Sequence, residues 1–249
     1  MAKIKFWGVQ GSTPGSLYKD NLGSNTPCVS IETDENLIIL DSGTGIRHLS
    51  KKLNNNDYKH ILLLITHSHW DHIQGFPFFD FLHADRSVYI YSHNKNHLKA
   101  MLNQVNGINF PLNQNDIKAN LIPVQSISEI ENRFEVSINT IQTNHHGDCI
   151  GYRIRNKKFD VCFLPDNQLH NPSNTSFDKF VEFCKDSQLL IHDGQYTEKD
   201  MPEKKDWGHS IIQDAHRLCI ESNSKSFVFF HHDPEREKSE ILEFEKKLN

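Results

Sequence analysis

Short runs of apolar residues recur along the chain, and most have the period or the length of a β-strand. Strict alternation, or a compact apolar run between polar residues, is typical of strands. The pattern predicts strands at residues 4–6, 28–33, 37–40, 61–65, 87–91, 134–144, 149–154, 159–164, 189–191 and 226–230. Because Asp34, Glu35 and Asn36 favour a turn, residues 28–40 are expected to form a hairpin.

Five other segments predict helices. Apolar residues over 177–186 stand at i, i+3, i+4 and i+7, which places them on one face of a helix. The other helices are expected at residues 45–53, 97–105, 211–220 and 235–248. Strands and helices are interspersed with no internal repeat or linker, so the sequence predicts a single α/β domain over residues 1–249.

The segments between these elements leave some alternatives open. The Gly-rich segment 8–14 lacks both phosphate-binding motifs, Gly-Lys-Ser/Thr and G-x-G-x-x-G, so we expect a turn beside the active site instead of a phosphate cradle. The Gly-Phe-Pro-Phe-Phe run at 75–79 can form an apolar wall for a ring such as a nucleobase, or it can pack in the core. Residues 54–60 are expected to form a loop, and residues 106–120 a loop or a partial lid.

Composition narrows the class of protein. The formal charge of −5 and the absence of a long basic run argue against strong nucleic-acid binding. The five cysteines show no C-x-x-C spacing, so we expect neither a disulfide framework nor a cysteine zinc site, and Cys162 and Cys184 read as core residues. The chain begins directly with a strand pattern and has no run of 18 apolar residues, which predicts a cytoplasmic protein without a membrane span.

The densest cluster of potential metal ligands directly follows the apolar run at 61–65. His67, His69, Asp71 and His72 fall there within six residues. In an extended exit from a strand, His67 and His69 point the same way, while Asp71 and His72 follow where the chain turns. Such a set suits two metal ions side by side. The alternative is a polar loop with incidental histidines, which three histidines and an aspartate at this spacing disfavour.

The spacing H-x-H-x-D-H resembles the signature of the metallo-β-lactamase fold superfamily. The resemblance implies a four-layer αββα sandwich, in which two mixed sheets pack face to face with helices outside. It also implies one or two transition-metal ions; imidazole-rich ligation favours zinc, with manganese as the alternative. The signature identifies the superfamily and leaves the substrate open, because hydrolases of lactams, thioesters, lactones and phosphodiesters share it.

The same resemblance implies a ligand set. One metal ion would be bound by His67, His69, His145 and a shared Asp166, and the other by Asp71, His72, His231 and the same Asp166. His146 and His232 are the alternatives to the neighbouring histidines. The resemblance places the ligand on the histidine that follows Asn144, which is His145, and His231 is favoured because it comes directly off its strand, as in similar proteins. Asp41, which precedes a Gly-rich turn, would orient a ligand, although a plain Asp at a tight turn is the alternative.

Two further motifs resemble the tRNase Z branch of the superfamily. His192-Asp193 follows a strand and Gly208-His209-Ser210 precedes a helix. By this resemblance Asp193 holds one tautomer of His209, and His209 assists the leaving oxygen. The alternative is that His209 only caps the helix. The catalytic candidates are therefore Asp71, Asp193 and His209.

tRNase Z proteins carry a long basic arm between the third-motif histidine and the bridging aspartate. Here His145 and Asp166 are only 21 positions apart, so no arm is expected. The leading hypothesis is a binuclear phosphodiesterase that hydrolyses a small phosphodiester, above all a cyclic nucleotide, with a metal-bridging hydroxide. An RNA 3′-processing endonuclease, another hydrolase of the fold such as an esterase or lactonase, and a non-catalytic metal-binding module are the alternatives. Similar proteins are often homodimers, so a homodimer is also expected.

Overall fold

The structure is a computed structural model that describes residues 2–15, 24–52, 58–170 and 172–248. The last residue of the helix expected at 45–53 and most of the loop expected at 54–60 lie outside the described residues. No helix in the described ranges is long and apolar enough to cross a membrane.

The strands form two mixed sheets, which confirms the predicted sheet arrangement. The first sheet has the order β1-β2-β3-β4-β5-β6, and the second has the order β11-β10-β9-β8-β7. The strands of the first are β1 (Lys3–Gly8), β2 (Cys28–Glu32), β3 (Asn36–Leu40), β4 (His60–Leu64), β5 (Ser87–Tyr91) and β6 (Asn120–Pro123). Those of the second are β7 (Ser137–Gln142), β8 (Ile150–Asn156), β9 (Phe159–Leu164), β10 (Leu189–Asp193) and β11 (Phe227–Phe230).

Both sheets repeat one pairing pattern. In each, the first three strands along the chain pair antiparallel and the following strands pair parallel. The parallel strands leave the sheet at the same edge, so residues just after β3 and β4, and after β9, β10 and β11, come to one end of the molecule. This topology places the candidate site.

Alternating side chains of the strands create the layers. Leu62 and Leu64 of β4 face the core between the two sheets, where they join Tyr152 and Phe163 of the second sheet. Ile61 and Leu63 face the opposite way, toward the helices that cover the first sheet. Because every residue of 61–65 is fully buried, the strand is covered on both faces, as its continuous apolar run predicts.

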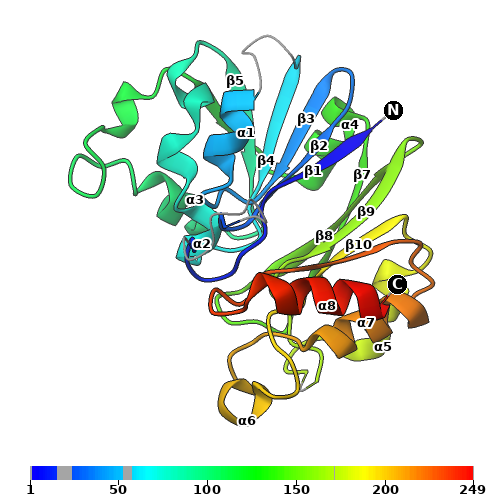
Figure 1. Cartoon of the computed structure of the whole chain (residues 1–249). Coiled ribbons are helices and arrows are strands. Elements are labelled where there is room, and N and C mark those ends of the chain that lie inside the picture. The colour runs from blue at the N-terminus through cyan, green and yellow to red at the C-terminus, as the bar shows by residue number, and fades with distance from the viewer. Residues whose placement is uncertain (1, 16–23, 53–57, 171, 249) are drawn as a thin grey trace.

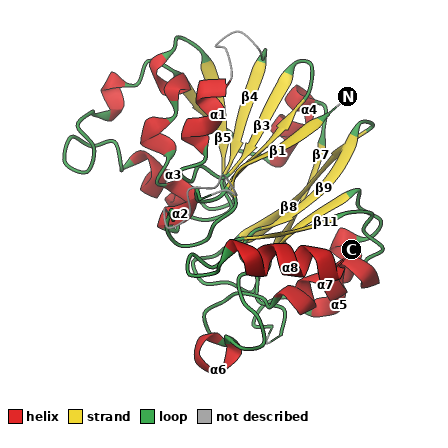
Figure 2. Cartoon of the chain, viewed as in Figure 1, coloured by secondary structure: helices red, strands yellow, loops and turns green. Residues whose placement is uncertain are grey.

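Helices cover the two outer faces. Helices α1 (Ile46–Lys52) and α3 (Lys95–Leu102) pack on the first sheet, and α5 (Phe177–Cys184) and α7 (Ile212–Glu221) pack on the second. Cys162 of β9 and Cys184 of α5 are buried in the core between the second sheet and its helices, as expected. The result is the predicted four-layer αββα sandwich (Figures 1 and 2). The remaining helices are α2 (Trp70–Ile73), α4 (Ile127–Phe134), α6 (Met201–Lys204) and α8 (Lys238–Leu248).

One predicted strand is partly wrong. Phe134 ends α4, and β7 begins only at Ser137, after Glu135 has taken a left-handed conformation with φ of 54°. The helix forms because Ser126 caps it through the N–H of Glu129, and because Ile130 and Phe134 lie on its buried face. The helix also contacts the start of β3, since the Asn36 amide donates to the carbonyl of Phe134. Helix α4 thus lies at the end of the strands opposite the candidate site.

Two other segments differ from expectation. The stretch 106–120 contains a 3-10 helix η3 (Gln114–Asp116) and leads directly into β6, an edge strand that the sequence pattern did not reveal. The aromatic run at 75–79 forms the 3-10 helix η1 (Phe76–Phe78), and a second one, η2 (Asp80–His83), follows. Phe76 and Phe79 are fully buried in the outer core, so core packing is the better account of that run.

Candidate metal centre

The candidate site is built where strands of both sheets end. His67 and His69 follow β4, His145 lies between β7 and β8, Asp166 follows β9, and His231 follows β11. Asp71 and His72 lie in α2, directly after the exit from β4. The structure thus brings together all seven side chains that the sequence proposes as metal ligands, from both halves of the sandwich.

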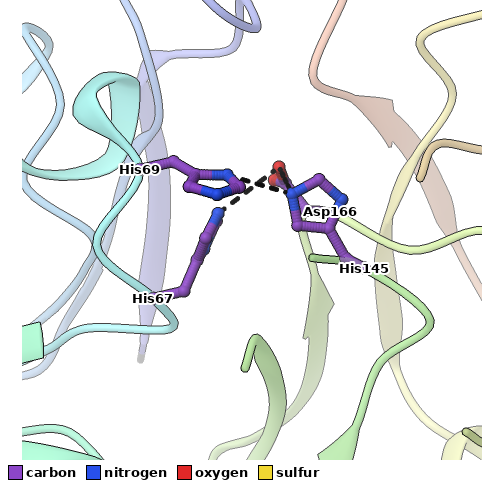
Figure 3. A group of neighbouring side chains, drawn as sticks. All are labelled: His67, His69, His145 and Asp166. Carbon is purple, nitrogen blue, oxygen red and sulfur yellow. Dashed lines mark hydrogen bonds and ion pairs between the residues drawn. The ribbon is translucent and has the colours of Figure 1, made fainter. Parts of the chain in front are cut away.

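Four of them form a first group, shown in Figure 3. His67, His69, His145 and Asp166 turn one donor atom each toward a common point, with all of these atoms within 4.8 Å of one another. Nε2 of His145 lies 3.1 Å from Nδ1 of His69 and 3.4 Å from Oδ2 of Asp166. Nε2 of His67 lies 3.7 Å from the same Oδ2. His69 is exposed to solvent, whereas His67 is fully buried.

Asp71, His72 and His231 form a second group on the other side of Asp166. Nε2 of His231 lies 3.0 Å from Oδ2 of Asp71, and Nε2 of His72 lies 3.0 Å from Oδ1 of Asp166. Asp166 therefore turns Oδ2 to the first group and Oδ1 to the second. A carboxylate that bridges two ions needs this arrangement.

The neighbouring histidines lie outside both groups. His146 is exposed, and the ring of His232 packs edge-on against Phe229 at 5.1 Å. Of the two alternatives at each position, the geometry favours His145 and His231.

The second nitrogen of most of these rings is held by a partner. Nδ1 of His72 donates to Asp41 at 2.8 Å, which is the orienting contact expected of Asp41. Three partners were not foreseen: Gln195 Oε1 at 3.0 Å from Nδ1 of His231, the Gly208 carbonyl at 2.8 Å from Nδ1 of His145, and Thr66 Oγ1 at 3.1 Å from Nδ1 of His67. Each contact leaves Nε2 of the ring directed to the centre, which is how metal-binding histidines are normally oriented.

The Gly-rich segment lies against this second group, as predicted. The backbone N–H of Ser12 donates to Oδ2 of Asp71 at 2.8 Å. A Cβ added to Gly11 would stand 2.4 Å from the imidazole of His231, so only glycine allows the loop to approach this closely. The segment is a turn that supports the site, and it does not form a phosphate cradle.

The donor atoms fit divalent cations. Among the described residues, Nε2 of His67, Nε2 of His72 and Oδ1 of Asp166 are buried and make only ion-pair contacts within the two groups, with no hydrogen bond of good geometry, which is a costly state for polar atoms. The nitrogen and oxygen donors, with buried carboxylates, are those that transition metals prefer. A cation between the groups would satisfy all three atoms at once.

The charges around the second group also favour a bound cation. Burial alone would lower the pKa of His72, but the carboxylates of Asp166, Asp71 and Asp41 outweigh it and raise that pKa well above the ordinary value. Burial likewise opposes protonation of His231, yet Asp166 and Asp71 raise its pKa to about 9. The carboxylates thus favour positive charge at this point, and a bound cation would supply it.

In the first group, burial outweighs the nearby carboxylate and lowers the pKa values of the histidines. It lowers the pKa of His67 well below the ordinary value, and it lowers the pKa of His145 to about 4 against the pull of Asp166. Both imidazoles are therefore neutral near pH 7, which leaves the lone pair of each Nε2 available to a metal ion.

Asp193 and His209 form a pair beside the two groups. Asp193 is fully buried at the end of β10, and its Oδ2 lies 2.7 Å from Nδ1 of His209. The ring of His209 stacks on that of His231 at 4.8 Å, with 15° between the planes. One ring nitrogen of His209 lies within 4.8 Å of donor atoms of both Asp166 and His231. Helix α7 begins three residues later and is capped at Ile211, so His209 does not act as the helix cap.

Comparison with known proteins gives one family and several relatives. The family described as the beta-lactamase superfamily domain matches residues 36–232. Among the relatives in sequence, a ribonuclease Z of Clostridium beijerinckii is 24% identical over 78% of each chain. A ribonuclease Z of Nanoarchaeum equitans is 39% identical, but over only 57 residues, or 23% of this chain and 18% of that protein.

Solved structures share the whole fold. The metallo-beta-lactamase fold protein YhfI from Bacillus subtilis has a TM-score of 0.71 at 16% identity and covers 99% of this chain and 92% of its own. Human tRNase Z, short form, has a TM-score of 0.68 at 19% identity, covering 94% and 93%. A diphosphatase from the PhnP family has a TM-score of 0.69 at 16% identity, covering 97% and 90%. At these identities the likeness establishes the fold alone.

Proposed function

The chain belongs to the beta-lactamase superfamily, with the metallo-β-lactamase fold, and we propose that it is a metal-dependent phosphodiesterase that hydrolyses a cyclic nucleotide. The observation that carries this proposal is the Asp193–His209 pair beside the two groups of ligands. A buried carboxylate bonded to one nitrogen of an imidazole, whose ring stacks on a candidate ligand, is the arrangement of a proton donor to a leaving oxygen.

We assign the metal ions to the groups that the structure brings together. His67, His69, His145 and Asp166 would hold one ion, and Asp71, His72, His231 and the same Asp166 would hold the other. When bound, two such ions supply a nucleophile at neutral pH and neutralise charge on the phosphate. The excess of imidazole over carboxylate in the set favours zinc over manganese.

His209 acts on the leaving group. Its Nδ1–H donates to Asp193, which fixes the tautomer and the orientation of the ring. The other ring nitrogen is directed toward the centre, where a proton on it can be transferred to the departing alkoxide. Asp193 is itself held by the backbone N–H groups of Asn167 and Gln195, at 3.0 and 2.9 Å, so the pair is preorganised.

Asp71 has two roles in this scheme. Its carboxylate belongs to the second group of ligands, and Oδ2 also accepts the N–H of Ser12. Burial would raise its pKa, but His72 and His231 hold that pKa well below the ordinary value, so Asp71 stays ionised. An ionised carboxylate at this position can accept a hydrogen bond from the attacking water and orient it.

Two observations support a small substrate. Between His145 and Asp166 the chain forms only the β8–β9 hairpin, with residues 157 and 158 as its turn, so no arm projects from this segment to grip folded RNA. The formal charge of −5 also disfavours a polyanion. RNA 3′-processing is the second candidate, and the similarity to two ribonuclease Z sequences favours it.

A substrate panel tests the proposal. The chelated protein is reloaded with zinc or manganese and assayed on several cyclic nucleotides, bis-p-nitrophenyl phosphate, a precursor tRNA and a thioester. We expect metal-dependent turnover of a cyclic nucleotide and of bis-p-nitrophenyl phosphate. Turnover of the precursor tRNA with none of the cyclic nucleotides would favour the second candidate. Turnover of the thioester alone would refute phosphodiester hydrolysis.

A further inference from the structure

A cavity of about 310 Å³ opens beside His145. Its walls come from three segments that follow β7, β9 and β10, and they consist mainly of polar side chains. The lining residues used below are Asn144, His145, Ser173, Asn174, Asp206 and Gly208. Ligand pockets in proteins range from about 300 to 1,000 Å³, so this cavity suits one compact part of a small molecule.

The cavity adjoins the reaction centre. Nε2 of His145 faces Asp166 at 3.4 Å, while the same ring lines the cavity. Gly208, also in the wall, accepts the Nδ1–H of His145 and directly precedes His209. A substrate whose phosphate lies at the centre therefore has this cavity within reach on the His209 side.

Asn144 holds one wall of the cavity in place through hydrogen bonds. Asn144 is buried, and its side chain makes four hydrogen bonds: Oδ1 accepts the backbone N–H groups of Asn174 and Thr175, and Nδ2 donates to the carbonyls of Gln168 and Thr175. All four distances lie between 2.8 and 2.9 Å. The loop that carries Ser173 is thereby fixed against His145, so the cavity is preformed.

Its charge selects the kind of group that can enter. No lysine or arginine lines the cavity, and its one carboxylate is that of Asp206, which is exposed. In the part of the chain that the structure describes, this carboxylate makes no hydrogen bond or ion pair. It would repel a second phosphate and attract an uncharged group that carries N–H donors.

We propose that this cavity binds the nucleobase of the substrate, and that Asp206 selects guanine over adenine. The inference rests on the proposed phosphodiesterase function and names its substrate more closely. Guanine presents N1–H and the N2 amino group side by side, so both can donate to one carboxylate, whereas adenine has an acceptor at N1. A bidentate contact of this kind corresponds to roughly 10- to 100-fold discrimination between bases.

Two variants test the cavity with the metal-loaded protein. The substrates are cyclic GMP, cyclic AMP and the 3′,5′-cyclic phosphate of 1-deoxyribose, which lacks a base. Asp206→Asn should reduce the preference for cyclic GMP at least tenfold in kcat/KM, because an amide no longer accepts two N–H groups. Ser173→Trp should fill the cavity, raise KM for both nucleotides and leave the base-free substrate unchanged.

Matched controls stand elsewhere in the chain. Glu198→Gln removes an exposed carboxylate from the same segment without touching the cavity, and Ser128→Trp places the same bulk on α4 at the far end of the sandwich. Both should behave as the wild type. Fluorescence titration with GMP and AMP gives a second readout that needs no turnover, and Asp206→Asn should weaken GMP binding selectively.

The outcomes separate the two hypotheses. If neither the nucleotides nor the base-free substrate is hydrolysed, the proposed function fails, and the titration still decides whether the cavity prefers GMP. If the base-free substrate is hydrolysed but Asp206→Asn and Ser173→Trp leave KM and base preference as in the wild type, only the base-binding role of the cavity is refuted.

Discussion

The Oδ2 atom of Asp193 lies 2.7 Å from Nδ1 of His209, and the ring of His209 stacks on that of His231. Asp193 is fully buried and accepts two backbone N–H groups as well, so the position of its carboxylate is fixed before any substrate binds. The pair joins the end of β10 to the segment before α7. In the proposed reaction this pair would be the proton-transfer group, and the hydrogen bond that holds His209 comes from Asp193, which is not one of the proposed metal ligands.

Replacing the carboxylate of this pair should reduce catalysis with little effect on metal content. In Asp193→Asn the carboxylate that fixes the tautomer of His209 is lost, so we expect kcat on the phosphodiester to fall about 10²- to 10⁴-fold. Metal analysis of the purified variant should give the wild-type stoichiometry. Loss of metal in parallel with activity would contradict a role confined to the leaving group.

The same pair predicts non-additivity. His209→Ala should lower kcat about as much as Asp193→Asn, and the double variant should be no slower than the worse single variant, because the two residues act as a unit. Steady-state kinetics of the three variants decide this. Multiplying effects would mean that Asp193 and His209 act separately.

Asp166 should be required for both ions. Its two oxygens face the two groups, at 3.4 Å from Nε2 of His145 and 3.0 Å from Nε2 of His72. Metal analysis of Asp166→Ala should show less than half of the wild-type content, because each site loses a ligand. Asp34→Ala, which removes an exposed carboxylate paired with Lys158, should retain the full content. Retention of both ions by Asp166→Ala would refute the shared position.

Asp41 should matter through its contacts with His72 and Thr66. It occupies a left-handed conformation with φ of 58°, which Asn tolerates better than most residues, so Asp41→Asn preserves the backbone. The variant loses the carboxylate that accepts Nδ1–H of His72, and metal affinity should fall about 10- to 100-fold. Competition with a coloured chelator measures this affinity. Unchanged affinity would make Asp41 a turn residue only.

The hydrophobic pattern of the sequence predicted a strand or helix correctly where a single pattern extended over the whole of that strand or helix. The run 61–65 is apolar throughout and forms a strand buried on both faces. Phe134 was misassigned because the alternation of Phe134, Val136 and Ile138 crosses the boundary between α4 and β7. The left-handed Glu135 separates the two elements, and nothing in its side chain distinguishes it from other polar residues. β6 is a short, half-buried edge strand, so its periodicity is weak.

In the candidate site, too, the sequence indicates some residues and not others. The side chains proposed as ligands lie close to strand ends, where spacing and family resemblance both indicate them. The partners of their rings are harder to find, because Gln195 and the carbonyl of Gly208 reach His231 and His145 only through tertiary structure. Thr66 is the exception, since a hydroxyl directly before His67 is a local signal.

Metal binding should raise thermal stability. Nε2 of His67, Nε2 of His72 and Oδ1 of Asp166 are buried and make no hydrogen bond of good geometry within the described residues, so an ion that binds them stabilises the folded state and not the unfolded chain. At a free metal concentration 100-fold above Kd this linkage contributes about 2.7 kcal/mol. For a chain of this size that corresponds to a rise in Tm of roughly 5–10 °C, to be measured by scanning calorimetry with and without a chelator.

The size of this rise should depend on pH in one direction. A metal ion needs the lone pair of each imidazole, so protons compete with it, and binding becomes weaker as pH falls. The metal-induced rise in Tm should therefore be larger at pH 7.5 than at pH 5.5. Asp166→Ala should show little rise at either pH, which separates the effect of these ligands from unspecific binding elsewhere. An equal rise in Tm for Asp166→Ala and the wild type would place the stabilising ion outside this centre.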